Sequence, residues 1–169
     1  MRRSSKGPRI LIAGLGNLLL TDDGVGVHAV KELQTDSAPD LCVVEVGTAV
    51  LDALHLFEWA DKILAIDAMQ AGGAPGTIYS FGLDDVADTA PVSLHEIGLV
   101  SAFRFIPEKA RPEIRILGVE PEVIDYGLDL SPAVAAALPK LAQTARETVA
   151  EWRRNSIRHA ASAAADADR

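Results

Sequence analysis

RILIAGLGNLLLTDDG, residues 9–24, decides the fold because it joins a buried strand to a polar turn and the start of a helix. After Arg9 the run to Gly14 is wholly apolar, which is typical of a strand buried on both faces of a sheet. A helix is predicted from about Asp22, with Thr21 as its N-cap, because apolar residues then recur at helical spacing. The predicted buried stripe of this helix contains Gly26, Ala29, Val30 and Leu33.

Four further strands are predicted from short apolar runs, at residues 41–46, 62–66, 76–81 and 113–119. Three more helices are predicted. Thr48 caps one that carries Val50, Leu51, Leu54 and Phe57 at helical spacing, and the last opens at Ser131. The helix between them, at residues 94–105, buries Leu94, Ile97, Val100 or Ser101, and Phe105. Strands that alternate with helices favour a mostly parallel sheet covered on both faces. Only about eight residues separate Asp67 from the fourth strand, too few for a parallel crossover, so that strand is predicted to be antiparallel.

Length and composition predict one globular domain. The chain has 169 residues, of which 49% are hydrophobic and 24% are charged, and residues 1–155 are expected to form a single α/β domain. Pro139 is expected to kink or restart the last helix. Residues 156–169 are mostly Ala, Asp and Arg without a core-forming period, so we expect a flexible tail there.

The charge balance excludes several kinds of partner. A net charge of −8 repels phosphate backbones and anionic membrane surfaces, so we expect neither nucleic acid nor a membrane as a partner. The single cysteine, Cys42, rules out an internal disulfide and favours a reducing compartment. Gly14, Gly16 and Asn17 interrupt the apolar run that would otherwise resemble a signal peptide. We therefore expect a cytoplasmic protein.

Residues 14–24 begin like a dinucleotide-binding fingerprint but do not complete it. Leu19 occupies the position of the third glycine, and Asp22 and Asp23 stand where a helix N-terminus would have to face a pyrophosphate. Two carboxylates oppose an anion there and would suit a cation instead. The alternative is that both acids only complement the helix dipole, by about 0.3–1 kcal/mol each. A nucleotide-binding enzyme is therefore disfavoured.

Two more residues carry the chemical signal. Asp67 follows the apolar run KILAI at the carboxyl end of a predicted central strand, the edge at which open parallel sheets bind ligands. His95 begins a predicted helix after a polar loop, whereas His28, His55 and His159 fall on predicted solvated positions. Each alone has an ordinary structural interpretation, as a loop-capping aspartate or a helix-start imidazole. Asp67 shares the predicted edge with Asp22 and Asp23, and two carboxylates with one imidazole would make an O,O,N ligand set suited to a divalent first-row metal.

Four segments in combination resemble the hydrogenase maturation endopeptidases that process nickel-iron hydrogenase large subunits. These segments are GLGNLLLTDDGVG at residues 14–26, AIDA at 65–68, SLHEIGL at 93–99 and ILGVEPEVIDYGLDLSPAV at 116–134. The resemblance extends from about Arg9 to Trp152. It implies a three-layer α/β/α, phosphorylase/hydrolase-like fold with a five-stranded sheet of order 2-1-3-5-4 and strand 4 antiparallel.

The resemblance also implies a site and a substrate. Asp23, Asp67 and His95 would form a metal site that recognises nickel, with Asp23 and Asp67 as the catalytic residues of an aspartic-type or metal-dependent endopeptidase. The nickel would be supplied by the large-subunit precursor, from which the enzyme, expected to be a monomer, would remove a C-terminal extension. Gly16, Asn17 and Asp22 are expected to support the site.

One segment departs from the family pattern. Many relatives have Asp-Gly-Gly-Thr after the second strand, where this chain has Glu45-Val46-Gly47-Thr48. The resemblance makes Glu45, Gly47 and Thr48 candidate residues for choosing the precursor. A noncatalytic nickel-dependent chaperone or metal-binding domain for hydrogenase assembly is the alternative function, since it would use the same acidic and imidazole ligands without cleavage.

Overall fold

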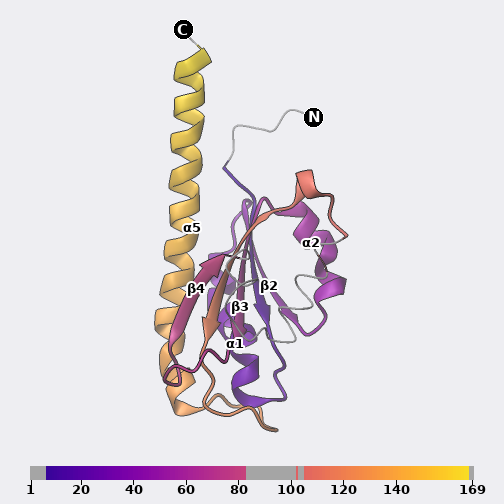
Figure 1. Ribbon diagram of the computed structural model, residues 1–169, viewed down its shortest axis with the longest axis vertical. Helices are drawn as coiled ribbons and strands as arrows, with labels where there is room; N and C mark the ends of the chain where they lie inside the picture. Colours follow the sequence, from indigo (N-terminus) through magenta and orange to yellow (C-terminus); the bar gives the residue numbers. More distant parts are fainter. Residues whose placement is uncertain (1–6, 83–101, 103–104, 168–169) are drawn as a thin grey trace.

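A computed structural model of the chain describes residues 7–82, 102 and 105–167 (Figure 1). The strands are β1 (Ile10–Leu15), β2 (Leu41–Gly47), β3 (Lys62–Ala68), β4 (Ile78–Gly82) and β5 (Glu113–Val119). The α-helices are α1 (Val25–Leu33), α2 (Leu54–Trp59) and α5 (Pro132–Ala167). Short 3-10 helices occur at η1 (Thr21–Gly24), η2 (Gln34–Asp36), η3 (Val50–Ala53) and η4 (Glu108–Ala110).

The strands form one sheet in the order β2-β1-β3-β5-β4. All neighbouring pairs are parallel except β4 and β5, which are antiparallel. This confirms both the order implied by the family resemblance and the antiparallel fourth strand argued from its short connection. The register places Gly14 of β1 beside Ile66 of β3, and Asp67 beside Gly118 of β5, so these strands end together at one edge.

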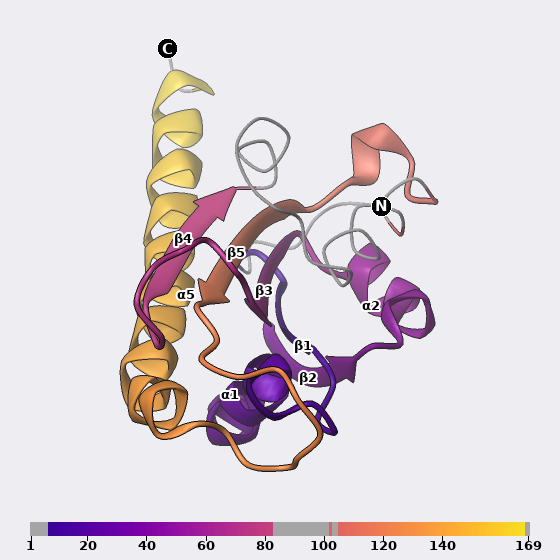
Figure 2. The same ribbon diagram turned by 60° about the horizontal axis from the view of Figure 1, so that its bottom comes forward.

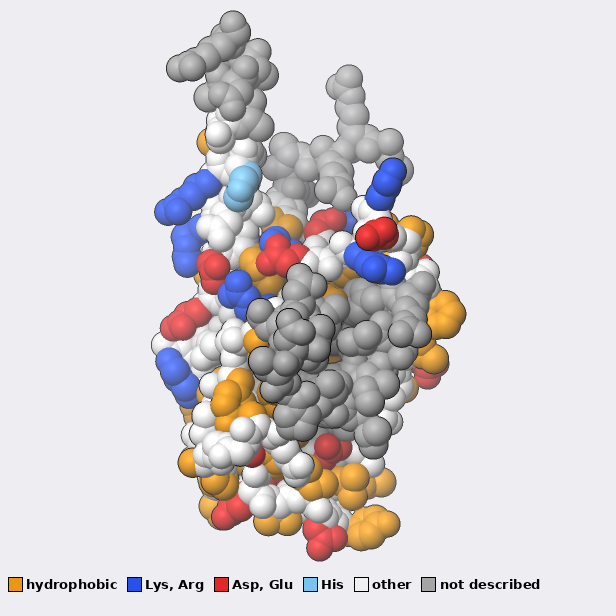
Figure 3. All heavy atoms as spheres, viewed as in Figure 1, with side chains coloured by type: hydrophobic (Ala, Val, Ile, Leu, Met, Phe, Trp, Pro, Cys, Tyr) orange, Lys and Arg blue, Asp and Glu red, His pale blue; other side chains and the backbone are white. Residues whose placement is uncertain are grey.

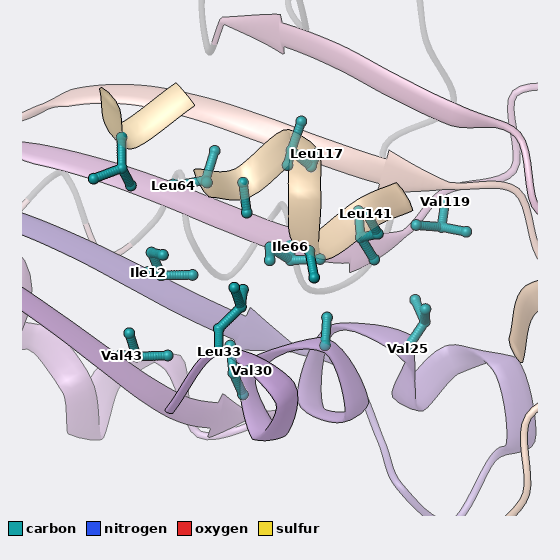
Figure 4. Packing of buried hydrophobic residues seen from close by; sticks show 14 of the residues in the cluster. Ile12, Val25, Val30, Leu33, Val43, Leu64, Ile66, Leu117, Val119 and Leu141 are labelled. Atoms are coloured by element: carbon teal, nitrogen blue, oxygen red, sulfur yellow. The ribbon is translucent and has the colours of Figure 1, made fainter. Parts of the chain in front are cut away.

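Successive strand residues face opposite sides of the sheet, so both sides are apolar. A layer of helices covers each side (Figure 2). Ile12, Leu64, Ile66 and Leu117 pack with α1 and α5, as Figure 4 shows for part of that cluster. The other face of the sheet, with Leu11, Ala13, Ile63 and Ala65, packs against η3 and α2, from which Phe57 is buried. The predicted three-layer arrangement is therefore confirmed.

The predicted helix caps are wrong, although the predicted buried stripe of α1 is confirmed. Gly26, Ala29, Val30 and Leu33 are all buried. Gly24, not Thr21, precedes α1, and the Thr21 hydroxyl instead donates to the Val123 carbonyl at 2.7 Å. Thr48 makes no cap either, because α2 follows the 3-10 turn η3. Leu51, which the sequence places at helical spacing with Val50, Leu54 and Phe57, is exposed. In both places a 3-10 turn separates the strand from the α-helix.

Helix α5 is longer than the sequence predicts. It continues through Pro139 without a restart, because the exposed proline lies opposite the buried Val134, Leu141 and Ala145 that hold the helix on the sheet. The helix also includes residues 156–167, where the sequence predicts a flexible tail. Alanine has the highest helix propensity, which favours this extension beyond the core residue Trp152. Figure 1 shows the end of α5 projecting past the sheet.

The predicted helix at residues 94–105 lies mostly outside the described residues. Ala102 is helical and buried, but Phe105, predicted to be buried, is 66% exposed. The chain turns there, with the Phe105 amide bonded to the Ala102 carbonyl, and Ile106 enters the core instead. Of the helices in the described ranges, none combines the length and apolar character needed to cross a membrane.

Candidate active site

Asp67 lies where the sequence predicts it, at the carboxyl end of the central strand β3. Its side chain is fully buried, and Oδ1 accepts a hydrogen bond from the Ala68 amide at 2.9 Å. Parallel sheets bind their ligands at this edge, so the carboxylate is well placed for chemistry.

Asp23 is held by the loop between β1 and α1. Its Oδ2 accepts a hydrogen bond from the Asn17 amide at 2.9 Å, and Asn17 in turn accepts one from the Leu19 amide at 3.0 Å. Gly16 has φ of +110°, and a Cβ at this position would lie 1.8 Å from the Asp23 carbonyl oxygen. Asn17 thus holds the Asp23 carboxylate, and the missing side chain of Gly16 lets the Asp23 backbone approach closely.

The first turn of α1 approaches the strand ends without intervening side chains. A Cβ on Gly26 would lie 2.0 Å from the Ile66 carbonyl oxygen and 2.4 Å from that of Leu15. Asp23 is three residues before Gly26, and Asp67 directly follows Ile66. This contact brings the loop that carries Asp23 against the strand end that carries Asp67.

Asp22 has a different role from its neighbour, because it is fully buried and binds another segment of the chain. Its carboxylate accepts hydrogen bonds from the amides of Glu122 (2.8 Å), Val123 (3.0 Å) and Ser131 (2.7 Å), and from the Ser131 hydroxyl (2.8 Å). Burial alone raises the pKa of Asp22, but these hydrogen bonds outweigh it and hold the pKa below its usual value. Asp22 therefore anchors residues 122–131 at the carboxyl edge.

Glu120 is a structural acid at this edge that the sequence analysis missed. Its buried carboxylate accepts hydrogen bonds from the amides of Ala71 (2.8 Å), Gly73 (3.2 Å) and Gly72 (3.3 Å), and from the Tyr79 hydroxyl (2.9 Å). Burial raises its pKa, but the hydrogen bonds dominate and lower it overall. Glu120 directly follows the apolar run that predicts β5, as Asp67 directly follows the run that predicts β3, so the strand-end argument could have found it.

The predicted recognition segment lies at the same edge. Glu45 and Thr48 are exposed, and Glu45 pairs with Gly14 in the sheet register. The Gly47 carbonyl accepts a hydrogen bond from the Gly16 amide at 3.2 Å, so this segment adjoins the loop that holds Asp23.

His95, the third predicted metal ligand, lies outside the described residues. Within residues 7–82, 102 and 105–167, no three His, Cys, Asp or Glu side chains are grouped to hold a metal. His55 and His159 are exposed as predicted, but His28 is half-buried, and its Nε2 atom is buried without a hydrogen-bond partner among the described residues.

Cys42 is not suited to act as a nucleophile. Its side chain packs against the core, and burial raises the pKa of its thiol, which disfavours the reactive thiolate.

Comparison with known proteins identifies the family. Residues 27–148 match the sequence model of HycI, the hydrogenase maturation protease family. The chain belongs to this family. The hydrogenase 2 maturation protease of Escherichia coli strain K12 is 35% identical over 144 residues, which cover 80% of this chain and 87% of the relative. A hydrogenase expression/formation protein, HupD of Bradyrhizobium diazoefficiens, is 31% identical over 161 residues, or 90% of this chain and 83% of HupD.

Solved structures agree with the assignment to the maturation proteases. The hydrogenase maturating endopeptidase HybD from Escherichia coli superposes with a TM-score of 0.76 at 27% identity, covering 85% of this chain and 93% of HybD. The [NiFe] hydrogenase maturation protease HybD from Thermococcus kodakarensis gives a TM-score of 0.73 at 28% identity, covering 83% and 98%. The chain is therefore a hydrolase of the maturation protease fold, and the acidic edge described above is its candidate active site.

Proposed function

We propose that this protease removes the C-terminal extension from the precursor of a nickel-iron hydrogenase large subunit after nickel has been inserted. The observation that carries the proposal is the pair of aspartates, Asp23 and Asp67, brought to one sheet edge by the close contact of Gly26 with β3. A similar protease from Thermococcus kodakarensis is named for [NiFe] hydrogenase, which supports this substrate class.

Nickel enters this proposal as part of the substrate. Two carboxylate oxygens and the imidazole of His95 are suitable donors for a divalent first-row metal, and they leave positions for ligands from the precursor. A precursor without nickel gains no such coordination bonds and binds weakly. Recognition of the metal would therefore act as a checkpoint that delays cleavage until the large subunit is loaded.

Cleavage requires water to attack the scissile carbonyl carbon, after which the C–N bond breaks and the leaving amine takes a proton. Asp23 and Asp67 are the candidates to accept the proton of the water, in an aspartic-type mechanism. In a metal-dependent mechanism the nickel of the substrate polarises the carbonyl, and the same carboxylates hold the metal. Asp23 is the more accessible of the two, because Asp67 is fully buried.

The test is to incubate the protease with nickel-loaded and nickel-free precursor and to measure product mass by intact mass spectrometry. A shortened product is expected only with nickel. Asp67→Asn and His95→Ala should each lower the processing rate by on the order of 10³-fold or more, with an unchanged circular dichroism spectrum. Glu32→Gln, which removes an exposed carboxylate near the other end of α1, is the matched control and should process at the wild-type rate.

Each other outcome contradicts a specific part of the proposal. Processing that does not depend on nickel would exclude metal recognition. Nickel-dependent binding without a shortened product would support the chaperone function instead. Full activity in either Asp67→Asn or His95→Ala would remove that residue from the site.

We also assign the choice of precursor to the exposed Glu45 and Thr48. Both lie beside the loop that holds Asp23, because the Gly16 amide of that loop donates to the Gly47 carbonyl between them. Glu45→Gln and Thr48→Val should therefore change the relative rates for precursors of different hydrogenases while leaving the nickel requirement intact. Equal rates across a panel of precursors would contradict this assignment.

A further inference from the structure

Five large apolar side chains are exposed on two loops at the carboxyl edge of the sheet. Tyr126 is 89% exposed, Leu128 is 64% exposed and Leu19 is 61% exposed. The apolar patch is completed by Val123 and Ile124, which are also exposed. Contiguous exposed apolar side chains in a soluble domain mark an interaction surface more often than scattered ones do.

Backbone hydrogen bonds join the two loops into one surface. The Thr21 amide donates to the Gly127 carbonyl at 2.9 Å, and the Gly127 amide donates to the Leu19 carbonyl at 3.0 Å. These bonds hold Thr21 at φ of +43°, an unfavourable conformation for a threonine. The buried Asp22 carboxylate also anchors the second loop, because it accepts a hydrogen bond from the Val123 amide. The apolar patch is therefore a fixed part of the fold.

Exposed carboxylates alternate with the apolar residues of the second loop, and the sequence around both loops contains no basic residue. Glu122, Asp125 and Asp129 are exposed on the second loop. Residues 10–30 and 116–139, which contain both loops, include no Lys or Arg, although the chain has sixteen of them. In Figure 3 the Lys and Arg side chains lie over the middle and upper parts of the visible face, and the lower end shows apolar and acidic side chains. The complementary partner has an apolar centre with Lys or Arg around it.

We propose that the apolar patch is the docking surface for the large-subunit precursor, a protein partner with a basic rim, and this inference rests on the proposed function. Leu19 belongs to the same loop as Asp23, so a folded substrate whose scissile bond reaches Asp23 must lie over the patch. A second copy of this chain fits less well, because a symmetric contact would place the carboxylates of the two rims against each other.

The test is a steady-state comparison of wild-type protease with the double variant Tyr126→Ser/Leu128→Ser, using nickel-loaded precursor. The KM should rise by about tenfold or more, while kcat stays within about threefold, because the patch binds substrate but does not touch the reacting atoms. Ile157→Ser is the matched control: Ile157 is 67% exposed on α5, beyond the last core residue, and its loss should leave KM unchanged. An unchanged KM in the double variant would overturn the proposal.

The exposed carboxylates beside the patch lead to a separate prediction. The double variant Glu122→Gln/Asp129→Asn should raise KM several-fold at low salt, and its KM should depend less on NaCl concentration than that of the wild type. Equal salt dependence would contradict a basic partner surface. Sedimentation velocity of the protease alone provides a further check: a dimer that Tyr126→Ser/Leu128→Ser dissociates would assign the patch to a second copy and overturn the proposal.

Failure of docking and failure of the proposed function give different results. If the wild type does not shorten the precursor, the proposed function fails, and equilibrium binding of nickel-loaded precursor to the wild type and to the patch variant still tests docking. Equal binding by both proteins, or no binding by either, would overturn the docking proposal. If the wild type processes precursor and the patch variant has the same KM and affinity, only the docking proposal fails.

Discussion

The two ends of the sheet hold their carboxylates in different ways. At the amino end the acids pair with cations: Asp61 with Arg9, Asp40 with Arg153, and Glu113 with Lys62. Trp152 adds to this end, since its ring lies beneath Lys62 and Arg115, and its indole N–H donates to Glu113. At the carboxyl end Asp22 and Glu120 accept hydrogen bonds from backbone amides and hydroxyl groups.

The two kinds of partner leave a carboxylate with different amounts of charge to act on its surroundings. A carboxylate paired with a cation contributes little to the field around it, and such exposed pairs typically stabilise a protein by no more than about 1 kcal/mol. A carboxylate bonded to neutral donors is rigid but keeps its negative charge. The carboxyl edge therefore attracts cations without losing its internal order, which is what the proposed binding of a nickel-loaded precursor with a basic rim requires.

The largest expected effect is that of removing Asp22. Asp22→Ala leaves three backbone amides and the Ser131 hydroxyl without the buried carboxylate that accepts from them, so the free energy of unfolding should fall by about 4 kcal/mol. Asp40→Ala, at the amino end, removes a partly exposed pair with Arg153 and should cost about 1 kcal/mol or less. Urea unfolding of both variants measures the contrast. Equal losses would mean that the two ends do not differ in this way.

A second prediction concerns the contact that aligns the two aspartates. Gly26→Ala places a Cβ against the Ile66 and Leu15 carbonyl oxygens, which belong to the backbone and cannot rotate away. The free energy of unfolding should fall by about 3 kcal/mol, and processing should fall more than stability alone explains, because the loop that carries Asp23 must move away from β3. Activity assayed well below the melting temperature separates the two effects. A stable, fully active variant would contradict the proposed alignment.

Acid should destabilise the carboxyl end in a defined pH range. The pKa values of Asp22 and Glu120 are lowered in the folded protein relative to their ordinary values of 3.8 and 4.5, so the unfolded chain binds more protons as the pH falls. Their stabilisation is complete above about pH 5 and is lost as pH falls through the folded pKa values, by up to about 1.4 kcal/mol per pH unit for each group. The variant Asp22→Asn/Glu120→Gln should be less stable at pH 7 and should show a flatter slope from pH 5 to 3. A slope equal to that of the wild type would exclude these two groups as its source.

The smallest expected effect distinguishes the causes of two lowered pKa values. Burial raises the pKa of Glu113, but Lys62, Trp152 and Arg115 lower it overall. Because 1 M salt screens interactions with cations, the pKa of Glu113 should rise toward its usual value in 1 M NaCl, whereas that of Asp22 should change less. Carboxyl carbon chemical shifts measured during an NMR titration report both groups. A larger salt effect on Asp22 would reverse the comparison.

The sequence predicts the strands well because burial on both faces leaves a continuous apolar run. The last strand, for example, is predicted and observed at residues 113–119. The sequence predicts the helix caps poorly. The Thr21 hydroxyl, for example, donates to the carbonyl of Val123, which is more than one hundred residues away in the chain. The predicted burial of Phe105 is wrong for a related reason, because periodicity does not show where a turn ends a helix.

The candidate site is predictable only in part. Asp67 is found because it ends an apolar strand, and the same rule would have found Glu120 had it been applied to β5. No local signal separates Asp22 from Asp23: one is fully buried under residues 122–131, and the other is held by Asn17. Adjacent acids in a 3-10 turn point in different directions, and only the tertiary structure assigns their roles.

Gly14 of β1 and Gly26 of α1, where the strand and the helix meet, have a consequence for genetics. Overpacking in a core is usually relieved by a smaller side chain nearby, so second-site suppressors can be selected. At this junction a Cβ on Gly14 would lie 2.3 Å from the Gly26 carbonyl oxygen, and a Cβ on Gly26 would meet the backbone of Leu15 and Ile66. The Cβ on Gly14 would also meet the Val30 side chain at 2.8 Å, but the nearest atom in both clashes belongs to the backbone, so a shorter side chain would not relieve either clash fully. Revertants of Gly26→Ala should therefore restore the glycine itself.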